Sequence, residues 1–566
     1  MFEAIESNNR KYIKVIIAIV TIVFSFLVIR EGFYMDEAGL LSTYKPVYQG
    51  ERLFIDIWGE LQLGGILTYP LFALYYNLLE PILYSLGIGF VLYTRICYQI
   101  VRLLISIYLY LTIRKTDYKS GAFWAALAYY LFFVSFKNFS YKSMCDFGIM
   151  LFLCWGIRYI ITKNNAYFIL MGLATCISIL AYPTMIIFPF IFVIYMIIAM
   201  FKGNSFIKPI IICSITCFFI GGLVLLYLQI TAGIQNILPQ FLYIEDQAYG
   251  EPGYIRFGMM IVRYFVFFVI AYLPILVMNI ASRWKQLEWK TYNTVLSLYW
   301  IIFMAVIIGL RIQSVSTTRL IYGFLLIFFW YPYLMHPQKN TEYVQIGYYK
   351  QSELSVNEAL KFVFWFSAII QLIWAVSTNQ EIAIPGHMCF YVVIALLILS
   401  EDCVEGLKLL RLAIVVCLLF FGNIWIAEGN GGYNHIFEKR IYVEHGAFRG
   451  IALDEADYEM NEDCCKLADT YLRDEDRVFV LHGYCYTVYL NSNAHQGPGP
   501  YARAGVGQNR VLQYWTINSE DVPDYVIINR KNEYYSEFEN SDTAKYIFEN
   551  YKTTVAKEGN FILLAR

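Results

Sequence analysis

Apolar runs long enough to cross a bilayer recur from residue 12 to about residue 427, and they constrain the fold more than any other feature. The chain has 566 residues, of which 58% are hydrophobic and only 15% are charged. A soluble chain of this length would divide into several domains with far more charge. Because a backbone inside lipid must satisfy its own hydrogen bonds, these runs predict a polytopic α-helical membrane protein.

We place thirteen spans in these runs, and basic residues set their orientation. The loops rich in Lys and Arg, such as Arg114-Lys115, share one side with Arg10 and Lys11. Basic loops stay inside, so we expect a multi-pass protein of the cell membrane with a cytoplasmic N-terminus and an extracytoplasmic C-terminal domain. The predicted spans are roughly 12–30, 95–113, 120–136, 147–163, 166–181, 185–201, 207–230, 259–281, 293–310, 320–335, 359–377, 388–401 and 412–427.

Residues 64–94 are apolar enough for a further span, yet they contain Pro70, Glu80 and Pro81. A single crossing here would invert every later loop and place the basic residues outside. We therefore predict juxtamembrane or re-entrant structure on the outer face, sheltered by the bundle. A tight hairpin of two short spans would leave every later loop on the same side of the membrane, and it stays open as an alternative.

From about residue 428 the chain becomes polar, which predicts two domains: a transmembrane domain over 1–427, with 31–94 as an outer loop, and an extracytoplasmic domain over 428–566. The second is expected to be a small α/β domain. Its strand-like runs are Arg477–Leu481, Thr487–Leu490, Tyr525–Ile528 and Phe561–Leu564.

Asp36-Glu37 follows the first predicted span, at the outer mouth of the bundle. Two adjacent carboxylates beside a bilayer are costly unless they are solvated, paired or functional. One interpretation is that they solvate a helix end. The other is that they act as a general base facing a lipid-borne substrate.

Further charged residues are predicted on the same outer face, and we treat them as candidate substrate-binding residues: Asp56, Arg95, Lys142, Asp146, Arg311 and Arg319. Arginine and lysine suit the phosphate of a polyprenyl-phosphate-linked sugar, and they would stabilise charge as that phosphate leaves. A carboxylate is needed to take the proton of an acceptor hydroxyl. A divalent metal at the carboxylates stays open. The net charge of −1 gives no basic field for nucleic acid.

Residues 12–165 resemble the GT-C superfamily of membrane glycosyltransferases, in the branch of protein O-mannosyltransferases and lipid A aminoarabinose transferases. The resemblance lies in Asp36-Glu37, Gly50 through Asp56, Pro70-Leu71, Arg95 and Asp146. It implies an inverting glycosyltransferase that moves a hexose or pentose from a polyprenyl-phosphate donor to a glycan, lipid or protein acceptor of the cell envelope. It also implies that Asp36 is the base, that Glu37 is its neighbour, and that Asp146 helps form a substrate site.

Two other functions fit the same composition. A transporter or flippase of a lipid-linked or anionic substrate would need ionisable residues in mid-membrane, and Arg102, Arg158 and Arg263 are the clearest examples. A polysaccharide polymerase or ligase would share the donor class but would have its large outer loop between late spans. Here the charges cluster at the outer edge, and the largest outer loop is the first one, which favours the transferase.

Overall fold

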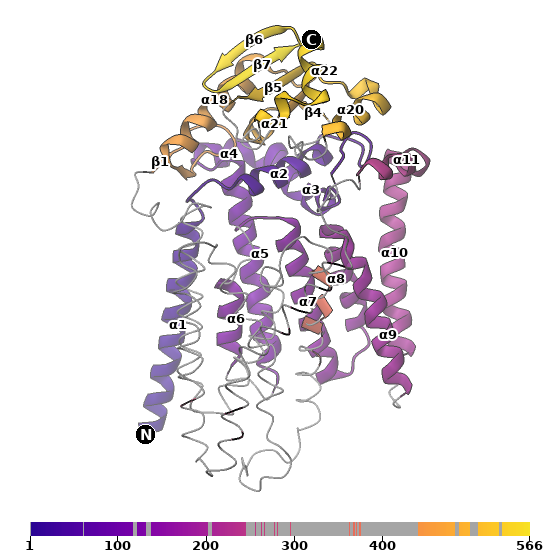
Figure 1. Ribbon diagram of the computed structural model, residues 1–566. Helices are drawn as coiled ribbons and strands as arrows, with labels where there is room; N and C mark the ends of the chain where they lie inside the picture. Colours follow the sequence, from indigo (N-terminus) through magenta and orange to yellow (C-terminus); the bar gives the residue numbers. More distant parts are fainter. Residues whose placement is uncertain are drawn as a thin grey trace.

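The computed structural model describes residues 2–59, 61–116, 121–131, 137–201, 207–244, 440–481, 486–497, 508–530 and 535–566, with scattered single positions between 255 and 374. Three layers are stacked along the long axis (Figure 1). Upright helices form the lowest layer, short helices lie across their upper ends, and a sheet domain covers these. The N-terminus lies at the lower end and the C-terminus at the upper end.

The upright layer contains helices at each of the first seven predicted spans. Of the other six predicted spans the structure describes only scattered positions between residues 262 and 374, so their bounds lie outside the described residues. The helices are α1 (Phe2–Val28), α5 (Phe90–Ile113), α6 (Ala122–Leu131), α7 (Tyr141–Thr162), α8 (Tyr167–Ala181), η2 (Pro183–Ile186) with α9 (Ile187–Phe201), and α10 (Ile207–Thr231). By length and composition alone, α5, α7, α10 and the segment Gly64–Ser85 could each cross a membrane.

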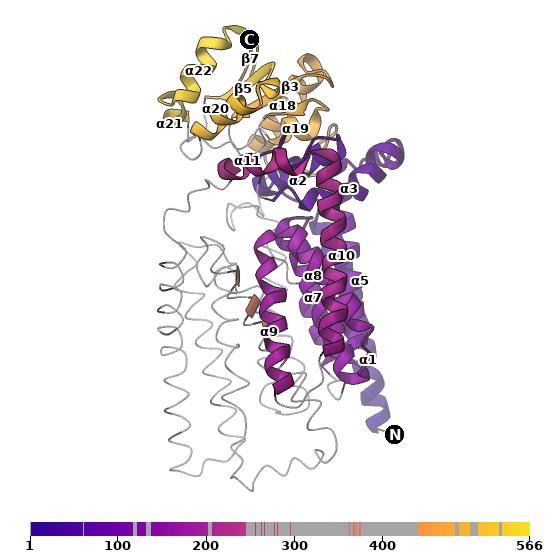
Figure 2. The same ribbon diagram turned by 90° about the vertical axis from the view of Figure 1, so that its right-hand side faces the viewer.

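The segment Gly64–Ser85 lies across the top of the bundle in both side views (Figures 1 and 2). It comprises α3 (Gly64–Leu74), a π-helical turn η1 (Tyr75–Leu79) and α4 (Glu80–Ser85), and it packs against α2 (Met35–Tyr48). Gly64 and Gly65 permit this packing, since a Cβ on Gly64 would lie 2.8 Å from the Tyr44 ring. The predicted outer loop 31–94 is therefore a layer of short helices, and the segment expected to be juxtamembrane lies across the upright helices.

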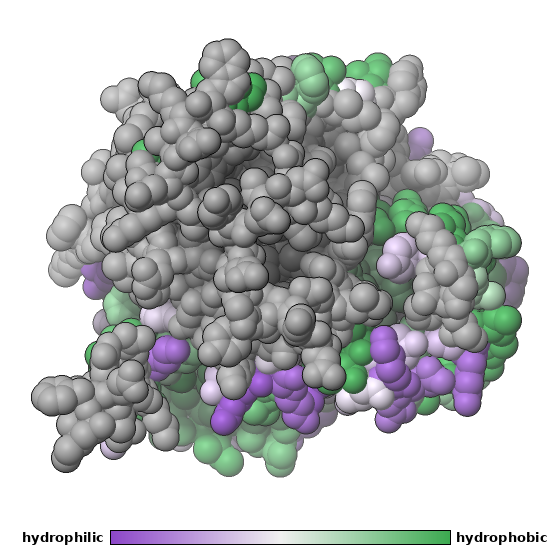
Figure 3. All heavy atoms as spheres, turned by 90° about the horizontal axis from the view of Figure 1, so that it is seen from below, coloured by the Kyte–Doolittle hydropathy of each residue, from purple (hydrophilic) through white to green (hydrophobic). Residues whose placement is uncertain are grey.

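The lower end carries the basic residues on which the predicted orientation rests. Arg114 and Lys115 follow the lower end of α5 and are exposed, at the same end as the N-terminus. Viewed from below, hydrophilic patches lie among hydrophobic ones along one edge of the described surface (Figure 3). The start of α2 and the sheet domain lie at the opposite end. Which end faces the cytoplasm stays a prediction.

The upper domain is an α/β domain with a five-stranded mixed sheet in the order β4-β3-β5-β7-β6. β3 (Arg477–Leu481) pairs in parallel with β4 (His495–Gln496) and β5 (Tyr525–Asn529), whereas β7 (Phe561–Ala565) and β6 (Thr553–Glu558) are antiparallel. The helices are α18 (Glu455–Tyr471), α19 (Tyr486–Asn491), α20 (Gln508–Ile517), η6 (Ser519–Asp521), α21 (Tyr535–Glu539) and α22 (Asp542–Asn550).

The predicted strand Thr487–Leu490 is wrong, because these residues form α19. Parallel strands need a crossover connection, and α19 connects β3 to β4 while packing on α2. Val488 and Tyr489 are buried in the core of the upper domain and Leu490 in the cluster that includes α2, so their β-branched and aromatic character reflects burial rather than a strand.

The upper domain is joined to the bundle by backbone hydrogen bonds. In the hairpin of β1 (Ile441–Tyr442) and β2 (Ala452–Leu453), the Ala452 N–H donates to Arg30 O at 2.7 Å and its carbonyl accepts from Gly32 N at 2.9 Å. The Val91 N–H, at the start of α5, donates to Ala447 O at 2.9 Å. These bonds dock the domain over the ends of α1 and α5.

Candidate functional site

Asp36 and Glu37 lie together in the first turn of α2 but in opposite environments. Tyr34 has an extended backbone and precedes the helix, and the Ala38 N–H donates to Tyr34 O at 3.1 Å. Asp36 is exposed, whereas Glu37 is fully buried. Both carboxylates suit the positive end of the helix dipole. The sequence predicts the pair, and the fold divides it into one accessible and one inaccessible group.

Glu37 is held by Arg95, which lies in the second turn of α5 rather than at its start. Arg95 donates from Nε to Glu37 Oε1 at 2.8 Å and from Nη2 to Oε2 at 2.5 Å. Its remaining N–H groups donate to the carbonyls of Ile29, Glu31 and Gly32 at 2.8, 3.2 and 2.9 Å. A guanidinium has five N–H donors, and each has a partner here. A phosphate could bind Arg95 only if this network opened.

Lys142 and Asp146 lie inside α7, which begins at Tyr141, whereas we predicted a loop up to residue 146. Lys142 is in the first turn and interacts electrostatically with Asp36. Within the described residues no hydrogen bond or ion pair occupies the Asp36 carboxylate, so the exposed acid and the lysine form the accessible part of the site. The structure thus brings Asp36, Glu37, Arg95 and Lys142 together.

Asp146 is directed to a different partner, one turn further along α7. Arg102 of α5 donates from Nη1 to Asp146 Oδ2 at 2.6 Å, and Tyr129 donates its hydroxyl to the same oxygen at 3.1 Å. Arg102 also donates twice to the Tyr129 carbonyl, at 3.0 and 2.7 Å. All three side chains are buried. This compensated pair fixes α5, α6 and α7 to one another.

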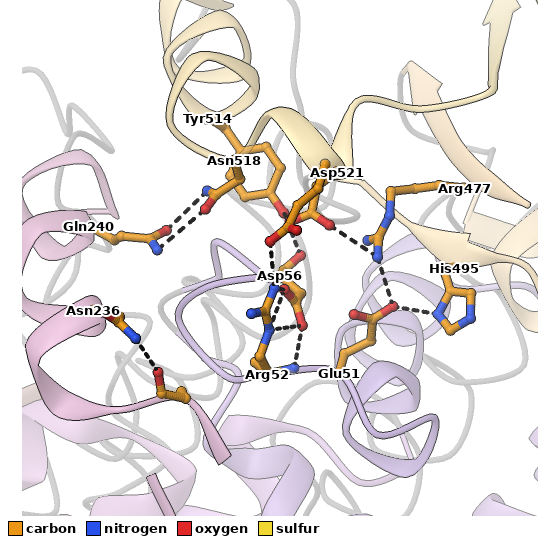
Figure 4. Close-up of polar contacts among 12 residues, drawn as sticks. Glu51, Arg52, Asp56, Asn236, Gln240, Arg477, His495, Tyr514, Asn518 and Asp521 are labelled. Carbon is orange, nitrogen blue, oxygen red and sulfur yellow. Dashed lines mark hydrogen bonds and ion pairs between the residues drawn. The ribbon is translucent and has the colours of Figure 1, made fainter. Parts of the chain in front are cut away.

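Asp56 faces the upper domain, at the joint between the transverse layer and the sheet (Figure 4). Arg52 donates to it from Nε at 3.0 Å, from Nη2 at 2.6 Å and from its backbone N–H at 2.6 Å. Burial alone would raise the pKa of Asp56, but the hydrogen bonds from Arg52 hold that pKa below its ordinary value. The Asp56 carbonyl accepts the Tyr514 hydroxyl at 3.0 Å.

The sequence did not identify the second half of this joint. Glu51 contacts His495 Nδ1 at 2.5 Å and Arg477 at 3.6 Å, and Arg477 also pairs with Asp521 at 3.1 Å (Figure 4). Burial raises the pKa of both Glu51 and Asp521, and Arg477 opposes that rise in each case. Gly50, with φ of +85°, ends α2 and turns the chain toward this cluster. The partners are more than 400 residues from Glu51 in sequence, so no local signal connects them.

Two buried lysines were also not predicted as site residues. Lys45 of α2 donates to the carbonyls of Tyr489, Leu490 and Ser492, at 3.0, 3.4 and 2.6 Å, around the end of α19.

Lys137, just before α7, is 3% exposed, and burial together with nearby Arg102 lowers its pKa to about 7. In the sequence, Lys45 is marked only by the following Pro46 and Lys137 only by the following Asn138, and neither pattern predicts a buried lysine.

Arg311 and Arg319 lie outside the described residues. Among the described residues, no group of three or more His, Cys, Asp and Glu side chains is arranged to hold a metal ion.

The fold and this site define a helical multi-pass membrane protein whose transverse layer of short helices is covered by an α/β domain. No family model matches the chain, and no curated protein matches it in sequence. Several solved structures match the chain in structure. ArnT from Cupriavidus metallidurans bound to undecaprenyl phosphate is 10% identical, with 97% of each chain covered and a TM-score of 0.43. The same protein in the apo state is 8% identical, with 99% and 98% covered and a TM-score of 0.45.

The archaeal oligosaccharyltransferase AglB from Archaeoglobus fulgidus, in complex with an inhibitory peptide and a dolichol-phosphate, is 12% identical. The match covers 96% of this chain and 72% of that one, with a TM-score of 0.42. All three matches are 12% identical or less, with TM-scores from 0.42 to 0.45.

Proposed function

We propose that this protein is an integral-membrane inverting glycosyltransferase that uses a polyprenyl-phosphate-linked sugar and an acceptor on the outer face of the membrane. The observation that carries the proposal is the division of the Asp36-Glu37 pair. Glu37 is buried against Arg95, whereas Asp36 is exposed beside Lys142. A general base must be accessible to the hydroxyl whose proton it takes, and only Asp36 of the two satisfies this.

In the proposed step the acceptor hydroxyl oxygen attacks the anomeric carbon from the side opposite the phosphate. The bond between that carbon and the phosphate oxygen breaks, and the polyprenyl phosphate leaves with the bonding electrons. Asp36 takes the hydroxyl proton, and Lys142 stabilises the negative charge that develops on the leaving phosphate. Arg311 and Arg319 stay as proposed substrate-binding residues. Asp56, Arg95 and Asp146 could bind substrate only if their ion pairs with Arg52, Glu37 and Arg102 opened.

The structure favours this function over transport through the bundle. Arg102, one of the mid-span charges that a transporter would need, is neutralised by Asp146. Arg158 donates from Nε to Thr112 at 3.1 Å. Both charges therefore have structural partners within α5 and α7.

The test is to incubate the purified protein with a panel of polyprenyl-phosphate-linked hexoses and pentoses and to measure release of polyprenyl phosphate. We expect release from at least one donor, and a loss of about 10²-fold or more in Asp36→Asn. Asp542→Asn is the matched control, because Asp542 is an exposed acid in the first turn of α22. Equal turnover by Asp36→Asn and Asp542→Asn would reject Asp36 as the base.

A further inference from the structure

Asn138, in the segment just before α7, is completely buried beside the site. Its Nδ2 donates to Glu37 Oε1 at 2.7 Å and to Thr94 Oγ1 at 2.9 Å, while its Oδ1 accepts the Phe139 N–H at 2.8 Å. The opposite orientation of the amide would set its oxygen against the Glu37 carboxylate. The hydrogen bonds therefore fix both the position and the orientation of this side chain.

The backbone of Asn138 is tied to the start of α7. Its carbonyl accepts the Ser143 hydroxyl at 2.8 Å, and Ser140 and Ser143 form a reciprocal capping box. Lys142 lies within this first turn, next to Ser143. Asn138 thus connects the helical turn that carries Asp36 to the helical turn that carries Lys142.

We infer that Asn138 is a positioning residue that holds the Asp36 carboxylate and the Lys142 ammonium at their working separation. The inference rests on the proposed function, in which Asp36 is the base. Asn138 acts through Glu37 on one side and through the capped start of α7 on the other. In the proposed step Asp36 takes the acceptor proton while Lys142 stabilises the leaving phosphate, so both groups must be held at fixed positions. A misplacement of about 1 Å can cost about 10²-fold in rate.

The experiment compares Asn138→Ala with Asn461→Ala, which removes another buried asparagine from α18 of the upper domain. For Asn138→Ala we expect kcat to fall by about 10- to 10²-fold, with little change in the KM for the donor. A fall in kcat without a rise in KM separates lost positioning of the reacting groups from lost donor binding. Asn461→Ala should keep the wild-type kcat, since the packing it loses lies in the upper domain.

Lys142→Met and the double variant Asn138→Ala/Lys142→Met test the route of the effect. If Asn138 acts on the Asp36–Lys142 separation, the double variant shows no larger loss of kcat than Lys142→Met alone. Losses that add would overturn the inference, as would a wild-type kcat in a folded Asn138→Ala. Should Asn138→Ala fail to fold, Asn138→Ser, which keeps a short donor, must show an intermediate loss of kcat. A wild-type protein that releases polyprenyl phosphate from no donor would instead reject the proposed function.

Discussion

Arg95 and Glu37 form a two-pronged ion pair that is closed to solvent, with side chains 2% and 0% exposed. The pair joins the second turn of α5 to the first turn of α2, and every other donor of Arg95 goes to a carbonyl just beyond the end of α1. It therefore fixes the turn that carries Asp36, so its first role in the folded protein is structural. The predictions below test that role and the docking of the upper domain.

Arg95→Lys should destabilise the protein, because lysine cannot reproduce the two parallel hydrogen bonds to Glu37. We expect the free energy of unfolding to fall by about 1–3 kcal/mol, measured by thermal unfolding in detergent. Arg114→Lys is the control, since Arg114 is exposed at the lower end of α5. A stable Arg95→Lys protein that has lost donor affinity would return Arg95 to the role of phosphate ligand.

Asp36→Asn and Glu37→Gln should fail in different ways. Asp36→Asn should retain its melting temperature and lose transfer by about 10²-fold or more, since it removes an exposed base. Glu37→Gln should lose stability, because it leaves the buried Arg95 charge without its counter-ion, and its loss of transfer should be the smaller one. The two measurements are thermal unfolding and polyprenyl phosphate release. The reverse pattern would exchange the roles of the two residues.

Lys45→Met should loosen the upper domain. The variant leaves the three carbonyls around the end of α19 without their charged donor, and such hydrogen bonds contribute about 1.5–3 kcal/mol each. Faster amide hydrogen exchange over α19 and β4 is the expected result. Lys466→Met serves as the control, because Lys466 is 61% exposed and pairs within the domain with Glu558. Unchanged protection in Lys45→Met would show that this contact does not hold the domain.

Docking of the upper domain should weaken as pH rises above the acidic range. Burial raises the pKa of Glu51 from 4.5 and that of Asp521 from 3.8, so the docked state binds more protons than the undocked state. A raised pKa contributes stability that is complete below the ordinary value and is lost as pH rises through the raised value. The pKa of Asp56 is lowered from 3.8, so Asp56 stabilises the docked state above about pH 3.8, and this stabilisation is lost as pH falls further.

The measurement for this pH dependence is hydrogen exchange or limited proteolysis of the upper domain between pH 4 and 8. Glu51→Gln should flatten the dependence, because it removes the group that faces His495, Arg477 and Asp56. Glu455→Gln, in the exposed first turn of α18, should leave it unchanged. An identical pH dependence in Glu51→Gln and wild type would exclude Glu51 as its source.

The upright helices were predictable because apolar runs of this length have few alternatives in a bilayer. Their starts were less predictable. α5 begins at Phe90 and α7 at Tyr141, earlier than predicted, because the charges of Arg95, Lys142 and Asp146 favour a helix end when only the sequence is considered. Inside the fold Arg95 and Asp146 are neutralised by partners on neighbouring elements, so they lie within helices. A membrane-spanning helix tolerates a charge where a partner on a neighbouring element neutralises it.

The order of residues along the chain was enough to predict the membrane class, the approximate positions of seven helices, a polar α/β domain at the C-terminus and the place of Asp36-Glu37 after the first helix. Which charges meet could be seen only in the folded protein. It paired Glu37 with Arg95 across 58 residues, Asp146 with Arg102 across 44, and Glu51 with His495 across 444. The physical reason is that hydropathy acts residue by residue along the chain. A buried charge, by contrast, is stable only beside a partner that packing brings from elsewhere.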